Sequence, residues 1–289
     1  MLNNKRNAAL LFGEIIGMLG VAAVLIEAFF IISEISTKRY VAGSVTMSNC
    51  PSDMILIPAG EFIMGCYNDD ACDNNENPHK RVYLDAFCMD RTEVTQGAYE
   101  KEVGYNPSYF KTCGSNCPVE RVTWHNAGDY CTRVGKRLPT EAEWEKAARG
   151  TDGRTFPWGN APPDCEKNTR ANYACYKWRK DRRRKDSVFK MDGYAFTAPV
   201  GSFPSGASPY GVLDMAGNVW EWVQDCYDND WFFWMPKRNP VNKISGCGLR
   251  VMRGGSWFCP VPLMRVSMRG GAVLGNDGSN DGFRCARDL

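Results

Sequence analysis

Between Arg253 and Gly271 the sequence reads RGGSWFCPVPLMRVSMRGG, with one cysteine, Cys259, and a methionine five positions later, Met264. A thiolate is a nucleophile and a ligand for soft metal ions, and a second thiolate at that spacing could complete a reactive pair. The thioether of Met264 carries no charge and cannot form a disulfide. The segment alone leaves three interpretations of Cys259: half of a redox centre, a structural thiol, or the remnant of a lost active site.

Cysteine usage in the whole chain favours disulfides over metal binding. The 289 residues include 13 cysteines but two histidines, and no two cysteines stand in a CxxC pattern. A zinc site usually needs such pairs or more histidines. Disulfides form in oxidising compartments, so we expect the cysteine-rich part of the chain outside the cytoplasm. Because 13 is odd, at least one thiol is unpaired within the chain or pairs outside it.

An apolar run near the N-terminus predicts a membrane anchor. Residues 8–32 are almost continuously apolar, and as a helix they would extend about 37 Å, enough to cross the hydrocarbon core of a bilayer. The run is long for a signal peptide, and no small-residue cleavage site follows it. We expect residues 1–7 in the cytoplasm, a transmembrane helix over 8–33, a linker over 34–53 and an extracytoplasmic domain over 54–289, periplasmic if the source is bacterial.

Two carboxylates, Glu14 and Glu27, interrupt the apolar run. An ionisable side chain inside a bilayer is costly and commonly faces a partner or a polar cavity, although near a helix end it can also snorkel or take up a proton. The first alternative predicts a protein partner that contacts the anchor near these residues, within a larger membrane complex. The formal net charge of +2 gives no indication of a nucleic-acid partner.

The rest of the chain predicts an α+β fold with much irregular backbone. Short apolar stretches alternate with clusters of Gly, Pro, Asn and Asp. Thr140 and Glu143 form a capping box at the start of one expected helix. The capping residues and terminal glycines predict helices over 95–104, 125–135 and 139–150. Irregular backbone on this scale needs disulfides or bound cations to hold it in place.

Several strings together resemble the formylglycine-generating enzyme family, also called sulfatase-modifying factors. They cover about residues 54–288 in order and without large gaps. The matching strings are IPAGEFIMG, MDRTEVTQGAY, PVERVTWHNAGDYC, RLPTEAEWEKAARG, FPWGN, TAPVGSFPSGASPYGVLDMAGNVWEW, RVMRGGSW and GFRCARDL. The resemblance implies a fold similar to a C-type lectin, with little regular structure and with calcium and disulfides as staples.

The family's enzymes oxidise a sulfatase cysteine to formylglycine, using O2 and a copper(I) ion held by two thiolates. The first thiolate corresponds to Cys259 and the second to Met264, so the resemblance implies an incomplete copper site, and we expect no copper. Trp220, Ser256 and Arg269 align with an aromatic, a hydroxyl and a basic residue around the family's active site. With Cys259 they are either remnants of that site or scaffold residues, and no catalytic residue is assigned.

The resemblance also implies two structural calcium sites, because calcium takes carboxylate, amide and carbonyl oxygens. The first would use the side chains of Asn172 and Asp192 with the carbonyls of Tyr173 and Tyr194, and the second the side chains of Asp214 and Glu221 with the carbonyls of Gly217 and Val219. The alternative interpretation of Asn172 and Asp192 is that they cap loops.

Disulfide partners follow partly from the resemblance and partly from clustering in the sequence. In the family, the cysteine that ends the second helix pairs with the cysteine of the GFRC motif, which implies a bond between Cys131 and Cys285. Other cysteines lie close together in the sequence, namely Cys66 with Cys72, Cys113 with Cys117, Cys165 with Cys175, and Cys226 near Cys247. Cys259 is then the odd thiol or pairs with one of these.

Three functions are compatible with the sequence. The first is a membrane-anchored, non-catalytic binding or structural module, whose lectin-like loops bind a protein or a glycan. The second is a divergent copper-dependent oxidoreductase acting on protein cysteine, in which Cys259 works alone or with another ligand. The third is a lectin-fold protein that displays diversified loops near its C-terminus. The absence of a second active-site cysteine at Met264 favours the first.

Overall fold

A computed structural model of the chain describes residues 50–66, 72–164, 169–174 and 192–289. The predicted anchor over 8–33, with Glu14 and Glu27, lies outside the described residues. Within those ranges no helix is both long and apolar enough to span a bilayer. The folded unit begins at Cys50, inside the stretch predicted as a linker, because a disulfide ties Cys50 to Cys88.

Two small antiparallel sheets come mainly from the first forty residues of this unit. In the first, β1 (Met54–Ile57) pairs with β4 (Phe87–Asp90), and β4 pairs with β9 (Ala286–Asp288) at the end of the chain. The second is a hairpin of β2 (Gly60–Met64) and β3 (Lys80–Leu84). The last strand, β9, therefore pairs with a strand from the first part of the domain. The first sheet thus depends on contacts between residues that are far apart in the sequence.

The third sheet comes from the C-terminal half of the chain. Its order is β7 (Gly270–Val273), β6 (Leu249–Arg253), β5 (Trp220–Cys226) and β8 (Asp281–Gly282). The β5–β8 pairing is parallel and the other two are antiparallel. β8 pairs with the start of β5 through Asp281 and Gly282. This pairing places the end of the β7–β8 loop beside the start of β5.

The three predicted helices are present: α2 (Gln96–Val103), α3 (Trp124–Arg133) and α4 (Glu141–Arg149). The Thr95 hydroxyl accepts from the Ala98 N–H at 3.1 Å, and Thr140 and Glu143 form the expected capping box. One further turn, α5 (Trp231–Trp234), was not predicted. Short 3₁₀ helices lie in the connections between these elements: η2 (Asn74–Glu76), η3 (Lys111–Cys113), η4 (Pro204–Gly206) and η5 (Val261–Met264).

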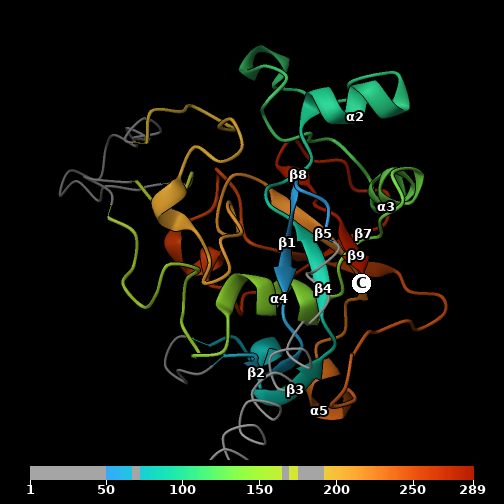
Figure 1. Cartoon of the computed structure of the whole chain (residues 1–289), viewed down its shortest axis with the longest axis vertical. Coiled ribbons are helices and arrows are strands. Elements are labelled where there is room, and N and C mark those ends of the chain that lie inside the picture. Colours follow the sequence, from blue (N-terminus) through green and yellow to red (C-terminus); the bar gives the residue numbers. More distant parts are fainter. Residues whose placement is uncertain (1–49, 67–71, 165–168, 175–191) are drawn as a thin grey trace, which may run out of the picture. The chain divides into compact units, whose positions relative to one another are not determined.

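Helix α4 lies at the centre of the domain, between the β2–β3 hairpin and the third sheet (Figure 1). All nine of its residues are buried, including its charged ones. Buried charges need partners: Glu145 binds both Arg149 and Arg253, and Glu141 binds Arg269. Lys146 instead donates to two backbone carbonyls. The helix is therefore held by ion pairs as well as by its apolar residues.

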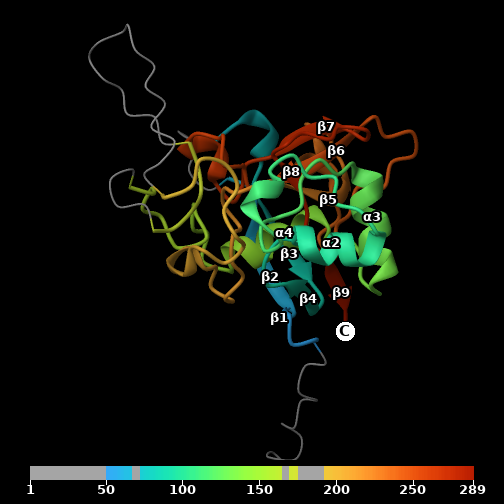
Figure 2. The same ribbon diagram turned by 90° about the horizontal axis from the view of Figure 1, so that it is seen from above.

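The segment that follows α4 supplies little regular structure. Both views place the described part of residues 150–215 on the side of the domain away from α3 (Figures 1 and 2). Among the described residues, disulfides join Cys50–Cys88, Cys66–Cys72, Cys113–Cys117, Cys131–Cys285 and Cys226–Cys247. The predicted pair of Cys165 and Cys175 lies outside the described residues.

Candidate functional site

The segment that carries Cys259 begins with a tight turn after β6. Gly254 and Gly255 have φ values of 91° and 73°, which L-residues with a side chain rarely adopt. A Cβ at Gly255 would also lie 2.8 Å from the Leu263 carbonyl oxygen. The two glycines therefore let the chain fold back on itself and bring Ser256 and Cys259 under the start of β5.

The thiol of Cys259 lies in a small polar network. Its Sγ is 3.3 Å from the Ser256 Oγ, and the Trp220 indole N–H hydrogen-bonds to it. The Asn280 amide donates to the same Ser256 oxygen at 3.4 Å. Burial raises the pKa of Cys259 above its usual value, against the smaller effect of these hydrogen bonds. In the described part of the chain it is the one free cysteine, and near neutral pH it is a protonated, buried thiol.

Met264 is part of a hydrophobic core cluster. Its side chain is fully buried at the end of η5. It belongs to a core cluster with Phe156, Ala171, Tyr173 and Ala216. The residue at the second thiolate position therefore serves the packing of the loop-rich side of the domain.

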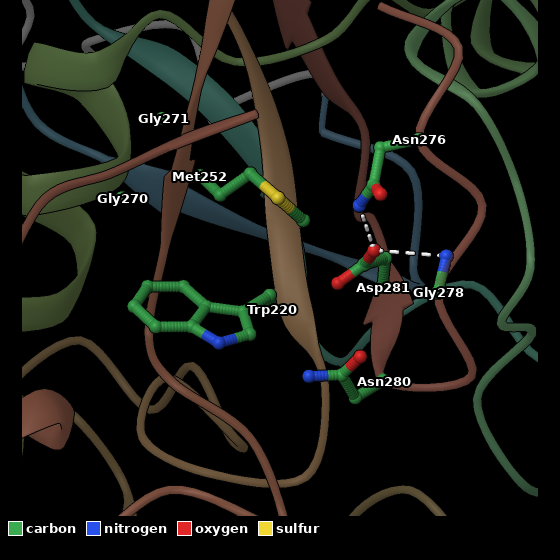
Figure 3. A pocket seen from close by; sticks show the side chains of 8 residues that line it. All are labelled: Trp220, Met252, Gly270, Gly271, Asn276, Gly278, Asn280 and Asp281. Carbon is green, nitrogen blue, oxygen red and sulfur yellow. Dashed lines mark hydrogen bonds between the residues drawn. The ribbon is translucent and has the colours of Figure 1, made fainter. Parts of the chain in front are cut away.

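A pocket of about 340 Å³ is lined in part by Trp220 (Figure 3). Four strands of the third sheet and the β7–β8 loop supply its lining, which consists of Trp220, Met252, Gly270, Gly271, Asn276, Gly278, Asn280 and Asp281. Through Asn280 and Trp220 it adjoins the Ser256–Cys259 network. The site thus consists of a buried thiol and a neighbouring pocket that share two residues.

Asp281 is the charged residue of this pocket. Its Oδ2 accepts from the Gly278 N–H at 3.0 Å and from the Asn276 amide. A Cβ at Gly278 would lie 2.5 Å from that oxygen, so only glycine lets the backbone come this close. Burial raises the pKa of Asp281 to about 6, and the charge of nearby Asp277 contributes. The carboxylate is therefore ionised at neutral pH and protonated in mildly acidic solution.

The residues that align with the family's active site lie in two separate places in the structure. Trp220 and Ser256 both contact the thiol network. Arg269 instead makes a two-pronged ion pair with Glu141 on α4, at 2.6 and 2.9 Å, and donates to two backbone carbonyls. Arg269 is therefore a buried structural cation, and its guanidinium is not among the groups that line the pocket.

The residues predicted for the first calcium site converge. The Asp192 carboxylate accepts from the backbone N–H of Tyr194 at 3.0 Å and also from that of Tyr173. Asn172 turns its amide nitrogen toward the Phe196 carbonyl, at 2.7 Å. Burial raises the pKa of Asp192, and no basic side chain of the described residues offsets this effect. A partly buried carboxylate without a cationic neighbour fits a calcium ligand.

The second predicted calcium site is more crowded. Glu221 Oε2 accepts from the Trp144 indole and the Arg284 guanidinium, whereas Oε1 accepts from Arg284 only. Oε1 therefore keeps one acceptor position. Asp214 and Glu93 lie beside this pair, and burial raises the pKa of both. The charge of Asp214 raises the pKa of Glu93 further, whereas a hydrogen bond with Glu93 lowers that of Asp214. Three carboxylates around one guanidinium must therefore hold a proton or bind a further cation.

Glu93 was not predicted, although it lies within the quoted string MDRTEVTQGAY. Its Oε2 is buried without a hydrogen-bond partner, which is costly for a carboxylate unless it is protonated or binds a cation. Asn280 and Asp281 were missed as well, although they directly precede GFRC. In the described ranges no three His, Cys, Asp or Glu side chains form a cluster suited to a metal, so any calcium would depend on amide and backbone oxygens too.

Comparison with known proteins settles the family. Residues 42–289 match the model of the sulfatase-modifying factor enzyme 1-like domain. The chain belongs to this family. The formylglycine-generating enzyme of Thermomonospora curvata is 32% identical in an alignment that covers 81% of this chain and 93% of that protein.

Two further similar proteins are relevant to the fold and the site. A mouse protein named inactive C-alpha-formylglycine-generating enzyme 2 is 36% identical over 175 residues, covering 58% of this chain and 48% of that protein. The structure of PvdO from Pseudomonas aeruginosa shares 30% identity, covers 84% of this chain and 97% of that one, and superposes with a TM-score of 0.68. The mixed α/β fold predicted from the sequence is therefore the family's fold.

Proposed function

We propose that this sulfatase-modifying factor domain is a non-catalytic binding module. The observation that carries the proposal is the state of the two thiolate positions: Cys259 is a buried thiol, and Met264 is part of the core. A copper(I) site of the two-thiolate type needs two soft anionic ligands at close range. Among the described residues every other cysteine is in a disulfide, so no second thiolate is available there.

The similarity to an inactive relative supports this proposal. The mouse protein is named as inactive, so membership of the family is compatible with a non-catalytic role. The oxidoreductase alternative would need Cys259 to act without a partner thiolate. Its burial and its raised pKa favour a resting thiol over a nucleophile.

The thiol itself gives a direct test of this interpretation. Because only thiolate reacts and burial raises the pKa of Cys259, iodoacetamide should alkylate it slowly in the native chain at pH 7.5 and rapidly after denaturation. The native rate should rise steadily up to at least pH 9. Mass spectrometry of the Cys259 peptide measures both rates. Fast alkylation of the native thiol at pH 7.5 would show an activated cysteine and contradict the proposal.

We place this module outside the cytoplasm, anchored by the helix expected over 8–33, with a protein partner near Glu14 and Glu27 and with a protein or a glycan as ligand of the domain. The disulfides of the folded unit support an oxidising compartment. After reduction, a membrane-impermeant thiol reagent should label the domain in intact cells. Complete protection of the cysteines would place the domain inside.

Calcium is the proposed structural cofactor of both loop sites. A ligand that binds only the folded state stabilises it by mass action, by about 2.7 kcal/mol at a hundredfold excess over Kd. Chelation with EGTA should therefore lower the Tm, and calcium should restore it. The matched variants are Asp192→Asn, which should respond less, and Asp277→Asn, which changes an exposed carboxylate and should respond like the parent. An unchanged Tm together with no calcium by elemental analysis would remove the assignment.

A further inference from the structure

Only one oxygen of the Asp281 carboxylate is used by the loop that surrounds it. In the described chain, both hydrogen bonds that Asp281 accepts end on Oδ2. The second oxygen points away from Asn276 and Gly278, into the pocket toward Trp220 and Met252 (Figure 3). The loop therefore holds the carboxylate in one orientation and presents an anionic oxygen to whatever enters the pocket.

The rest of the lining suits a cation rather than an anion. Asp281 is the only charged residue among the eight that line the pocket, and no basic side chain competes for it there. The Trp220 ring forms one wall (Figure 3), and an aromatic face adjacent to a carboxylate attracts ammonium and guanidinium groups. Gly270 lies against the ring, since a Cβ at this position would be 3.4 Å from Trp220 Cζ3.

An exposed group of aromatic residues includes Trp257 and Phe258, which follow Ser256 in the sequence. Tyr109, Phe196 and Phe258 are 69%, 47% and 52% exposed. Phe110 and Trp257 join them into one patch, with ring centroids 4.4 to 5.5 Å apart. We call these five residues the aromatic patch. Exposed aromatic clusters of this kind mark binding surfaces.

The chain connects the aromatic patch to the pocket directly. Trp257 and Phe258 follow Ser256 in sequence, and the Ser256 hydroxyl accepts from Asn280 in the pocket lining. A ligand that reaches both features must be longer than a single amine, and it must carry apolar groups as well as a positive charge. An extended peptide with a basic side chain between apolar residues has this chemistry.

We propose that the pocket binds the ammonium or guanidinium group of a basic peptide side chain, and that apolar side chains of the same peptide rest on the aromatic patch. The inference rests on the proposed binding function and names the class of its ligand. It also gives a role to the one carboxylate in a pocket whose other lining residues are neutral.

Calorimetry of the full chain with short peptides tests the proposal. The probe is acetyl-Phe-Gly-Lys-Gly-Phe-amide, and its matched control has norleucine in place of lysine. We expect the lysine peptide to bind at least about tenfold more tightly, the effect of one charge-assisted hydrogen bond. This preference needs no variant and so does not depend on how a substitution affects folding.

Two variants then separate the pocket from the general charge of the loop. Asp281→Asn keeps the shape and an acceptor for Gly278 but removes the charge, and it should abolish the preference for lysine. Asp277→Asn removes the same charge from an exposed position of the same loop and should keep the preference. An equal loss in both variants, or a preference that survives Asp281→Asn, would overturn the proposal.

A third probe, n-butylammonium, distinguishes a peptide from a small amine. It should bind much more weakly than the lysine peptide, because it cannot reach the aromatic patch, and equal affinity would overturn the assignment of a peptide ligand. The failure of this inference is distinguishable from failure of the proposed function. Aldehyde formation on a cysteine peptide would refute the non-catalytic role, whereas equal binding of the lysine and norleucine peptides would refute the pocket assignment alone.

Discussion

Removal of the disulfide between Cys131 and Cys285 should lower the free energy of unfolding by about 5 kcal/mol. The bond closes a loop with a sequence separation of 154 residues, and the loss of chain entropy in the unfolded state grows with the length of the loop. It also fixes α3 to the segment that leads into β9. The double variant Cys131→Ala/Cys285→Ala, followed by urea unfolding under oxidising conditions, measures the effect.

A second disulfide provides the matched control. Cys113 and Cys117 close a loop with a separation of only 4 residues, for which the same chain-entropy model gives about 2 kcal/mol. The corresponding double alanine variant should therefore be clearly more stable than the first. Equal losses in the two variants would show that loop closure does not determine the stabilisation by these bonds.

Loss of the negative charge of Glu145 is the second large effect that we expect. Glu145 is fully buried on α4, and its carboxylate binds Arg253 and Arg149. It also accepts from the Gly65 N–H at 2.7 Å, which links α4 to the end of β2. Glu145→Gln keeps the shape of the side chain but leaves the buried guanidinium of Arg253 without its closest anionic partner. Removing one member of a buried ion pair typically costs about 3–5 kcal/mol.

The control for this variant is the same substitution at the surface. Glu61 pairs with Arg81 at 3.3 Å, with side chains that are 55% and 66% exposed, and an exposed pair of this kind contributes below about 1 kcal/mol. Chemical unfolding of Glu145→Gln and Glu61→Gln measures both effects. A loss of 1 kcal/mol or less for Glu145→Gln would contradict the central role of these ion pairs in α4.

Local signals in the sequence predicted the helices well, because capping is a local interaction. Thr95 and Thr140 lie at the helix starts that their neighbours predicted. The burial of α4 was not predictable in the same way, because its three glutamates, Lys146 and Arg149 are residue types that usually face solvent. They are buried since their partners, Arg253 and Arg269, come from segments more than a hundred residues away, and no local pattern carries that information.

The candidate site likewise has one part that could be predicted from the sequence and one part that could not. Cys259 and its missing partner could be identified from the sequence, because the resemblance to the family places both thiolate positions in one short segment. The pocket could not, because β5, β6, β7 and β8 together supply its lining. Asp281 was not singled out in the sequence, and only the pairing of β8 with β5 places it beside Trp220. The pairing of β8 with β5, two strands far apart in the sequence, thus brings a residue at the end of a loop into the candidate pocket.

The exchange at position 264 is central to the proposed function, and restoring a cysteine there should not restore activity. Met264 packs in the core between Phe156 and Tyr173. Pro260 and Pro262 restrict the backbone that would have to bring two sulfurs together. A thiol introduced by Met264→Cys would therefore lie at a buried position, and the surrounding residues would hold it there.

The most direct measurement is turnover. The full chain is loaded with copper(I), supplied with O2 and a sulfatase-type cysteine peptide, and assayed for aldehyde by mass spectrometry, with the Thermomonospora curvata relative as the positive control. A non-catalytic module predicts no aldehyde from the unaltered chain and none from Met264→Cys. Aldehyde formation by the unaltered chain that Cys259→Ser abolishes would contradict the account and identify the protein as an oxidoreductase.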